Sequence, residues 1–253
     1  DFNMALIFFD GFETYATADI TKDWGSIVGS PTINATAGRR GGGALTIVNP
    51  SSPHGVQKVL PSPFSTMVVG FAFNITAIPT TARNICKLLD GVTNQLEIKL
   101  NTDGTLSVNR NGTTLGTTAS TIAPSADYYI EFKATIHDTT GSYELRVNGA
   151  NVLSATNIDT KNTTNASLSQ IFIGIDGNTG NSLTAKFDDL YMLDTTGSAP
   201  NNDFLGDVRI DAVYPTADGT YTAWTPSTGT SHYALVDETT PNTTDYNSSN
   251  TIG

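Results

Sequence analysis

The chain has 253 residues and a net charge of −11, with 38% hydrophobic and only 15% charged residues. This length is enough to bury one large core, and all-β sandwiches of this size often form a single domain. A surface with this charge repels nucleic acid phosphates and anionic membranes, so we expect neither as a partner. The charge suits a neutral or cationic partner, or serves only solubility.

The first part of the chain predicts short strands separated by turns. We expect a first strand at residues 5–9 and one helical turn between Tyr15 and Trp24, with Trp24 covering the core. The glycine-rich run 38–43 is followed by a strand pattern at 44–48, not by a helix. This order favours a tight turn with close backbone approach over a phosphate-binding loop. A strand at 55–60 is expected to end at Pro61 and Pro63.

The middle of the chain continues this pattern, with no convincing long helix. Strands are predicted at 66–75, 85–89, 95–100, 106–110, 128–136, 143–147, 152–155, 170–175 and 184–193. Asn-Gly and Asp-Gly pairs between them favour hairpin turns. The run 186–194 is expected to close the domain by pairing near the first strand. The single cysteine, Cys86, lies in an apolar run and is expected to be a buried small hydrophobe.

These features predict an all-β fold, a two-sheet antiparallel sandwich spanning residues 1–195. No apolar run is long enough to span a membrane, and the N-terminus lacks the features of a signal peptide. After Asp194 the composition shifts to Thr, Ser, Asn, Asp and Pro. Residues 196–253 are therefore expected to form a mostly irregular arm that packs on the sandwich or on a neighbouring subunit. Its one predicted strand is 207–214.

Two resemblances follow from particular runs. Residues 129–155, with the turn at Gly141 and the Asn148-Gly149 hairpin, resemble laminin-G-like, concanavalin-A-like jelly rolls, as does Phe187-Asp188-Asp189-Leu190. This resemblance covers roughly residues 5–195 and implies a jelly-roll sandwich. The runs 8–15, 204–209 and 214–219 are similar to uncharacterised structural proteins of tailed bacteriophages. In those phage proteins an arm follows the jelly roll. The resemblance therefore implies a virion component, and a chain that continues past residue 253.

The sequence contains no recognisable catalytic motif. Some jelly-roll proteins are glucanases with a Glu-x-Asp-x-x-Glu strand, but the five glutamates here are scattered. There is no Gly-x-Ser-x-Gly elbow and no His-Glu-x-x-His, and His54, His137 and His232 lie apart in turn-like surroundings. We therefore name no catalytic or cofactor-binding residue and predict that the protein is not an enzyme.

Two binding chemistries remain open. Laminin-G-like domains often hold calcium near a sheet rim, so Asp188 with Asp189, or Asn101 with Asp103, are candidate ligands. The alternatives are that the aspartate pair offsets Lys186 or shields an edge strand, and that Asn101–Gly104 is an ordinary turn. Three aromatic residues could stack on a sugar or anchor the arm to the sandwich. They are Tyr221, Trp224 and Tyr233.

The leading functional hypothesis is a non-enzymatic structural protein of a tailed phage, exposed on the virion surface as a capsid decoration or tail component. It would be assembled in the host cytoplasm and would act by binding other virion subunits, with a symmetric homo-oligomer expected. The alternative is a carbohydrate-binding adhesin for a host surface glycan, with calcium as a possible cofactor.

Overall fold

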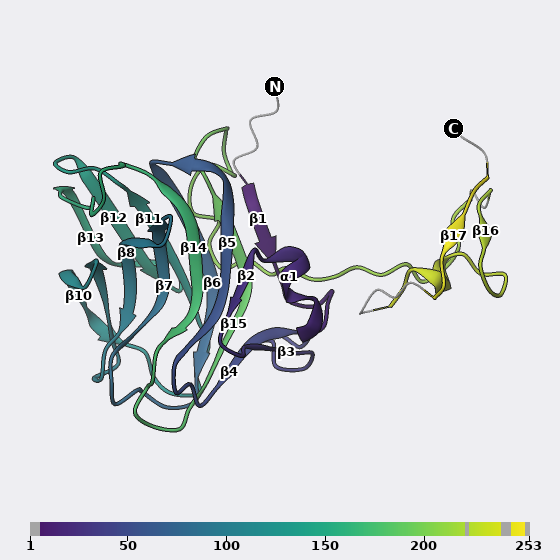
Figure 1. Cartoon of the computed structure of the whole chain (residues 1–253), viewed down its shortest axis with the longest axis horizontal. Coiled ribbons are helices and arrows are strands. Elements are labelled where there is room, and N and C mark those ends of the chain that lie inside the picture. Colours follow the sequence, from purple (N-terminus) through teal and green to yellow (C-terminus); the bar gives the residue numbers. More distant parts are fainter. Residues whose placement is uncertain (1–5, 221–222, 239–243, 251–253) are drawn as a thin grey trace.

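The computed structural model describes residues 6–220, 223–238 and 244–250. Two large antiparallel sheets face each other and enclose the main core, as predicted (Figure 1). The sandwich strands are β1 (Leu6–Asp10), β2 (Ser26–Val28), β3 (Thr32–Asn34), β4 (Ala44–Val48), β5 (Pro53–Phe64), β6 (Thr66–Ile75), β7 (Arg83–Asp90), β8 (Thr93–Leu100), β9 (Thr105–Arg110), β10 (Thr113–Thr121), β11 (Tyr128–Thr135), β12 (Gly141–Val147), β13 (Ala150–Ile158), β14 (Leu168–Asp176) and β15 (Thr184–Leu193). The predicted fold class is confirmed.

The chain crosses between the two sheets several times, with runs of consecutive strands in one sheet, such as β7 to β10 and β11 to β13. The eight-stranded sheet has the order β13-β12-β11-β6-β15-β4-β3, with β1 also paired to β15. The seven-stranded sheet has the order β10-β9-β8-β7-β14-β5-β2. The first strand pairs with the last one, from Leu6 opposite Leu193 to Asp10 opposite Leu190, as the sequence predicted.

The core between the sheets is built from the side chains that point inward from the strands of both sheets. Phe187 lies at its centre, with ring centroids 5.8 Å from Phe71 and 5.2 Å from Phe73. Trp24 closes one end and is 1% exposed. It follows the 3-10 helix η1 (Thr17–Asp19) and the short helix α1 (Ile20–Asp23), which form the predicted helical turn. Cys86 is buried in this core, as expected.

Strand β5 differs from the prediction, because it continues through Pro61 and Pro63 to Phe64. Proline cannot donate to a neighbouring strand and is tolerated at a sheet edge. β2 pairs with β5 only from Gly55 to Gln57, so beyond Gln57 the only named partner of β5 is β14. The prolines therefore lie on a locally free edge, where the strand can accommodate them.

Residues 207–214 also differ from the prediction, since they form no strand. They belong to an extended segment, residues 203–214, that we call the strap. The strap lies on the outward side of the eight-stranded sheet. Leu205 and Val208 of the strap pack there against an apolar cluster that is separate from the main core.

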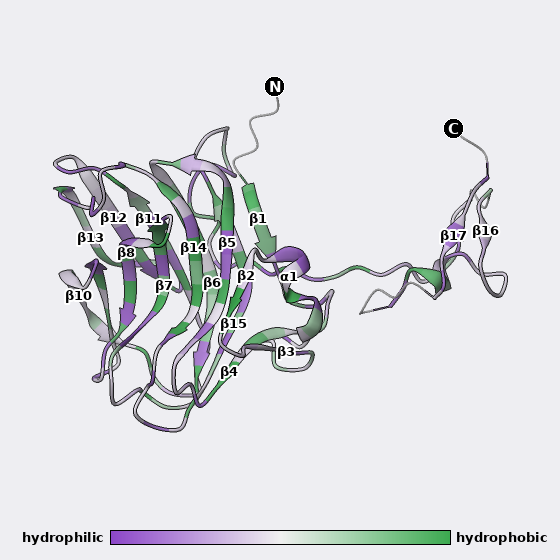
Figure 2. Ribbon diagram, in the orientation of Figure 1, coloured by the Kyte–Doolittle hydropathy of each residue, from purple (hydrophilic) through white to green (hydrophobic). Residues whose placement is uncertain are grey.

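The chain then leaves the sandwich as an arm (Figure 1). Its described part holds β16 (Thr225–Pro226), the 3-10 helix η2 (Tyr233–Leu235) and β17 (Asn247–Ser248). β16 pairs with β17, which is hydrophilic (Figure 2). The division into residues 1–195 and 196–253 stays a prediction. No helix in the described ranges is long and apolar enough to cross a membrane.

Candidate functional site

The outward side of the eight-stranded sheet is occupied by the strap. The apolar cluster beneath it consists of Val68, Ala72, Tyr129, Tyr191 and Leu193, all nearly fully buried. Gly70 leaves room for this packing, because a Cβ there would come within 2.2 Å of the Tyr191 ring. The strap therefore covers this apolar cluster and keeps it away from solvent.

A β-bulge in β15 aims two carboxylates at the strap. The register of β15 against β6 shifts between Asp188 and Tyr191, and Asp189 has a φ of 49°. Phe187 and Leu190 both belong to the main core, so Asp188 and Asp189 follow one another on the outward side. A bulge inserts one residue and re-aims the side chains around it.

Arg39 is the partner of these carboxylates. Its Nε lies 2.6 Å from Asp189 Oδ2, and its Nη1 lies 2.6 Å from Asp207 of the strap. It also donates to the carbonyl of Val208, and its guanidinium lies 4.9 Å from the ring centroid of Tyr129. The Arg39 and Asp189 side chains are 8% and 3% exposed. A buried guanidinium held by several acceptors fixes the strap to the bulge.

Backbone amides of the strap complete the attachment. Ile210 N donates to Asp189 Oδ1 at 2.7 Å, and Gly206 N donates to Glu131 Oε1 at 2.8 Å. Tyr191 also donates to Glu131 Oε1, at 2.5 Å. Burial raises the pKa of the Tyr191 hydroxyl, so it stays a donor at neutral pH. The strap is thus bound by polar contacts at its middle as well as by apolar packing.

The candidate calcium ligands have other partners in this structure. Asp188 accepts from Arg39 N at 3.0 Å and from Asp189 N at 2.7 Å. Burial, and then the adjacent Asp189, raise the pKa of Asp188 to about 6. Asp103 accepts from the amide and hydroxyl of Thr105 within its hairpin turn. Within the described residues no group of three or more His, Cys, Asp or Glu side chains is arranged to hold a metal ion.

The outward side of the seven-stranded sheet carries a continuous row of side chains, one from each strand. The register of the strands fixes which side chains are neighbours. Phe172 on β14 lies between Gln57 on β5 and Lys87 on β7. Glu97 on β8 lies between Lys87 and Asn109 on β9. The row ends at Ser26 on β2 and Thr114 on β10. With strands about 4.8 Å apart, six spacings give a row of roughly 30 Å. None of these residues belongs to either apolar core.

The centre of this row is held in place by neighbouring side chains. Lys87 Nζ lies 3.2 Å from Asp176 Oδ2 and 4.7 Å from the ring centroid of Phe172. Asn94 donates to Glu97 Oε1 at 2.8 Å, and burial raises the pKa of Glu97. A protonated Glu97 would donate as well as accept.

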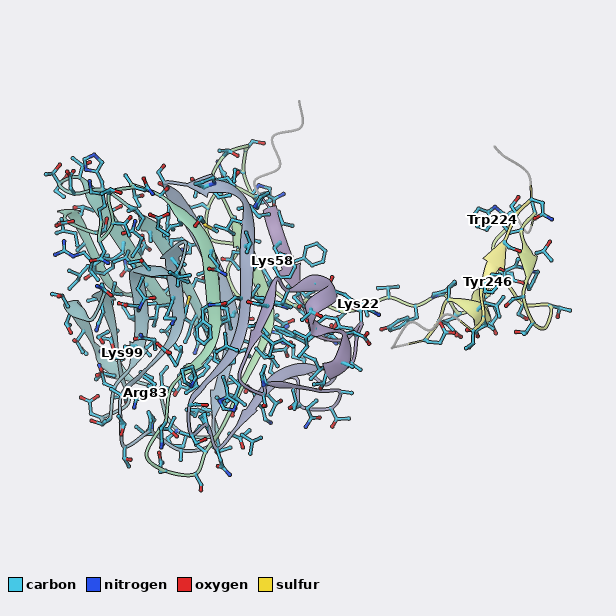
Figure 3. All side chains as sticks on the ribbon, in the orientation of Figure 1. Lys22, Lys58, Arg83, Lys99, Trp224 and Tyr246 are labelled. Atoms are coloured by element: carbon cyan, nitrogen blue, oxygen red, sulfur yellow. The ribbon has the colours of Figure 1, made fainter. Side chains whose placement is uncertain are left out.

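The next row along the sheet adds a second cation. Asn84 on β7 lies opposite Lys99 on β8, and Lys99 lies opposite Ser107 on β9. With the Asn109 amide turned to face its donors, its oxygen accepts from Lys99 Nζ at 3.0 Å. Lys99 and Arg83 lie at one end of these strands (Figure 3). Phe172, Glu97 and Asn109 are at most 2% exposed, so they support the row from below. The groups that the face presents are the partly exposed side chains of Ser26, Gln57, Lys87 and Lys99 and the exposed hydroxyl of Thr114.

A separate cavity of about 650 Å³ lies beside the strap. It is lined by Phe12, Glu13, the glycine-rich turn at residues 41–43 and strap residues including Tyr214. The turn makes the close approach predicted from the sequence, because a Cβ on Gly43 would come within 1.9 Å of Phe12 O. Burial, and then Asp188, Asp189, Asp211 and Asp10, raise the pKa of Glu13 to about 8.

The remaining predicted residues lie in other places. Trp224 is 58% exposed on the arm, away from the sandwich (Figure 3), and its carbonyl lies 2.7 Å from His232 Nε2. Tyr233 belongs to η2 on the same arm, and Tyr221 lies outside the described residues. His137 accepts from the amides of Thr139 and Thr140 in its own turn. His54 lies 2.8 Å from Ser52 O, also within its own turn.

Sequence reasoning missed Arg39, Glu13 and the polar row. Arg39 lies in the glycine-rich run 38–43, whose pattern indicates a tight turn but gives no sign of an ion pair. The row has no contiguous motif, because its members come from seven strands and meet only through the sheet order. The available signal was the alternation of polar residues with core residues in β7, β8 and β9.

Comparison with known proteins supports the fold. No family model matches the chain, and no curated protein sequence matches it. Among solved structures, it is similar to an endo-β-1,4-glucuronan lyase from Trichoderma reesei (TM-score 0.51, 14% identity, covering 67% of this chain and 90% of that one). It is also similar to an alginate lyase from Aplysia kurodai (TM-score 0.54, 13% identity, covering 69% of this chain and 92% of that one). A third similar structure is the cellulose-induced protein Cip1 (TM-score 0.52, 16% identity, covering 65% of this chain and 85% of that one). The chain therefore shares a jelly-roll-like sandwich with carbohydrate-active proteins.

The expectation that this protein is not an enzyme was wrong. It rested on missing hydrolase motifs, whereas the structures that share the fold include polysaccharide lyases. A lyase that cleaves a uronic acid polymer removes a proton next to a carboxylate, which requires a base and charge stabilisation. It does not require the paired carboxylates of a glycosidase, so their absence does not exclude activity.

The Arg39 attachment gives a direct prediction. Arg39→Ala leaves Asp189 buried without its cation, so we expect a loss of about 3–5 kcal/mol in unfolding free energy. The matched control is Arg40→Ala, because Arg40 contacts the same Asp207 but is 44% exposed. For Arg40→Ala we expect about 0–1 kcal/mol. Urea denaturation of the two variants measures both values, and equal losses would contradict this account.

Proposed function

We propose that this protein binds an extended polysaccharide along the outward side of the seven-stranded sheet. The observation that carries the proposal is the row from Ser26 to Thr114, which crosses all seven strands. On the opposite face of the sandwich, the strap covers the apolar cluster on β6, β11 and β15. The seven-stranded sheet is therefore the large sheet face that remains for a ligand.

The chemistry of the row supports a carbohydrate ligand. Sugar hydroxyls donate and accept hydrogen bonds, and the row alternates groups that do the same. Gln57 carries a partly exposed amide, Lys87 a partly exposed ammonium group and Thr114 an exposed hydroxyl, whereas Glu97 and Asn109 are buried and hold their neighbours in place. A row of roughly 30 Å suits a polymer better than a single sugar. The resemblance to carbohydrate-active structures supports the same ligand class.

Lys99 and Lys87 favour a polymer that carries carboxylates. Each offers a point charge on the ligand side of the sheet, and Lys99 has no ion pair among the described residues. A uronate carboxylate next to Lys99 would gain a charge-assisted hydrogen bond. If the bound polymer is also cleaved, the same cation would stabilise the charge that develops next to the carboxylate.

The binding test uses alginate, β-1,4-glucuronan and cellulose oligomers with the full chain. We expect Lys99→Ala to weaken binding of a uronate oligomer about tenfold, because a hydrogen bond to a charged group is worth about 1.5–3 kcal/mol. The control is Lys186→Ala, since Lys186 lies on β15 of the other sheet. That change should alter affinity less than about twofold.

Isothermal titration calorimetry measures the affinities, and ultraviolet absorbance of unsaturated sugar ends detects cleavage. Cleavage that is lost with Lys99→Ala would place an elimination reaction at the same face. Absence of binding to all three polymers, or equal weakening by both variants, would contradict the proposal.

A second candidate function is attachment to a larger assembly through the arm. Trp224 and Tyr246 are 58% and 55% exposed there, and the chain has no Lys or Arg after Arg209. Large exposed aromatic side chains are common at protein interfaces. The acidic arm suits a basic partner surface, as on a subunit of a larger particle. The idea that this particle is a phage virion, and that the chain acts on its surface, stays a prediction.

Oligomerisation gives the first test of the arm. If the arm binds other copies of the chain, a symmetric oligomer should be present and Trp224→Ser should dissociate it. If the partner is another protein, the wild-type chain should be a monomer. Sedimentation velocity distinguishes these outcomes, and an oligomer that is unchanged in Trp224→Ser would argue against assembly through this side chain.

A further inference from the structure

The strap backbone lies close to the carboxyl group of Glu13. A Cβ on Gly11 would come within 2.2 Å of the Ile210 carbonyl and within 2.3 Å of Glu13 Oε2. The Glu13 carboxyl and the strap backbone therefore meet at the same glycine. Tyr214 of the strap also donates to the Glu13 carbonyl, at 3.4 Å. A charge on the Glu13 carboxyl therefore acts at short range on the strap backbone.

The surroundings of Glu13 are strongly acidic. In the hydrogen bonds and ion pairs of the described residues, its side chain takes no part, so no cation or donor compensates a charge there. The titratable or charged groups on the elements around it are Asp10, Tyr15, Asp23, Arg39, Arg40, Asp188, Asp189, Asp207, Arg209, Asp211 and Tyr214. The three arginines are already engaged: Arg39 with Asp189 and Asp207, Arg40 with Asp207, and Arg209 with Asp211.

We propose that the strap is a proton-controlled latch, which is docked while the carboxyl of Glu13 is neutral and loosens when that carboxyl is ionised. One contact of the strap and one strap carboxylate lie next to the added charge. Asp189 accepts from Ile210 N, and Asp211 follows at once on the strap itself. Ionised Glu13 repels Asp211, and when the strap moves away this repulsion is relieved and the Glu13 carboxylate regains its hydration.

The direction of the pH dependence follows from linkage. Burial and the nearby carboxylates raise the pKa of Glu13 from 4.5 to about 8 in the docked state. The docked state therefore binds the proton more tightly than the released state, in which Glu13 is solvated. The contribution of Glu13 to docking is full below about pH 4.5, falls as pH rises towards 8, and falls no further above that value.

Asp188 also has a raised pKa, about 6, but it accepts from Arg39 N and Asp189 N and not from the strap. Its titration is nearly complete at pH 7, so a change in strap protection above pH 7 reports Glu13.

Release of the strap uncovers a defined surface. The cluster of Val68, Ala72, Tyr129, Tyr191 and Leu193 loses its cover, and Glu131 loses the Gly206 amide. Mildly alkaline conditions therefore expose an apolar, tyrosine-rich face on the eight-stranded sheet. Mildly acidic conditions close it.

Hydrogen exchange of the full chain tests the latch. The probes are the amides of Gly206 and Ile210, which donate to Glu131 and Asp189 in the docked state. Their protection factors, which correct for the intrinsic pH dependence of exchange, should fall at least about tenfold between pH 6 and 9. In Glu13→Gln, which keeps the shape of the side chain without its charge, most of this fall should disappear above pH 7.

Two controls make the result decisive. Asp138→Asn removes one carboxylate in the turn after β11, and it should leave the fall in protection unchanged. Amides in β8 report global stability and should stay protected across the range. Protection of Gly206 and Ile210 that is constant up to pH 9, or that falls equally in Glu13→Gln, would overturn the proposal.

Discussion

The buried guanidinium of Arg39 connects three parts of the chain that are far apart in sequence. It extends from the glycine-rich turn, pairs with Asp189 at the bulge of β15, and pairs with Asp207 of the strap. Arg39 and Asp189 would each be costly to bury alone, whereas Asp207 is 47% exposed, so the buried pair depends on both of its partners. Through this contact the strap is fixed over β6, β11 and β15, on the outward side of the eight-stranded sheet.

The position of the strap determines which sheet face is accessible to a ligand. A jelly-roll sandwich has two large outward faces, and here one holds an apolar cluster under the strap while the other holds a polar row. The function that we propose follows from this difference, with support from the carbohydrate-active proteins that share the fold. The arm that extends from the strap carries exposed aromatic residues and is available for a different partner.

Much of the fold could be predicted because alternation is a local property of a strand. β6, β11 and β15 were recognisable as strands from their own residues, and the pairing of β1 with β15 followed from their positions at the ends of the domain. The tight turn before β4 was also predictable, because a strand and not a helix follows the glycines. The local sequence sufficed wherever no distant contact changed the outcome.

The functional features were less predictable because they depend on contacts across sheets. The bulge places Asp188 and Asp189 on the same side of β15, whereas simple alternation would have separated them. Residues 207–214 alternate like a strand, yet their polar contacts include Asp189 and Arg39 instead of a strand ladder. Phe172 and Lys87 are neighbours only because β14 lies next to β7, which no local pattern shows. The absence of motifs was therefore a poor guide to activity.

The most direct test of the central claim is to map where a bound polysaccharide lies. Backbone amide resonances of the full chain would be followed by NMR during titration with a uronate oligomer. We predict that the shifts concentrate in β5, β14, β7, β8 and β9, with residues 203–214 and β11 unchanged. Shifts that concentrate in the strap, in the Glu13 cavity or in the arm would contradict the account.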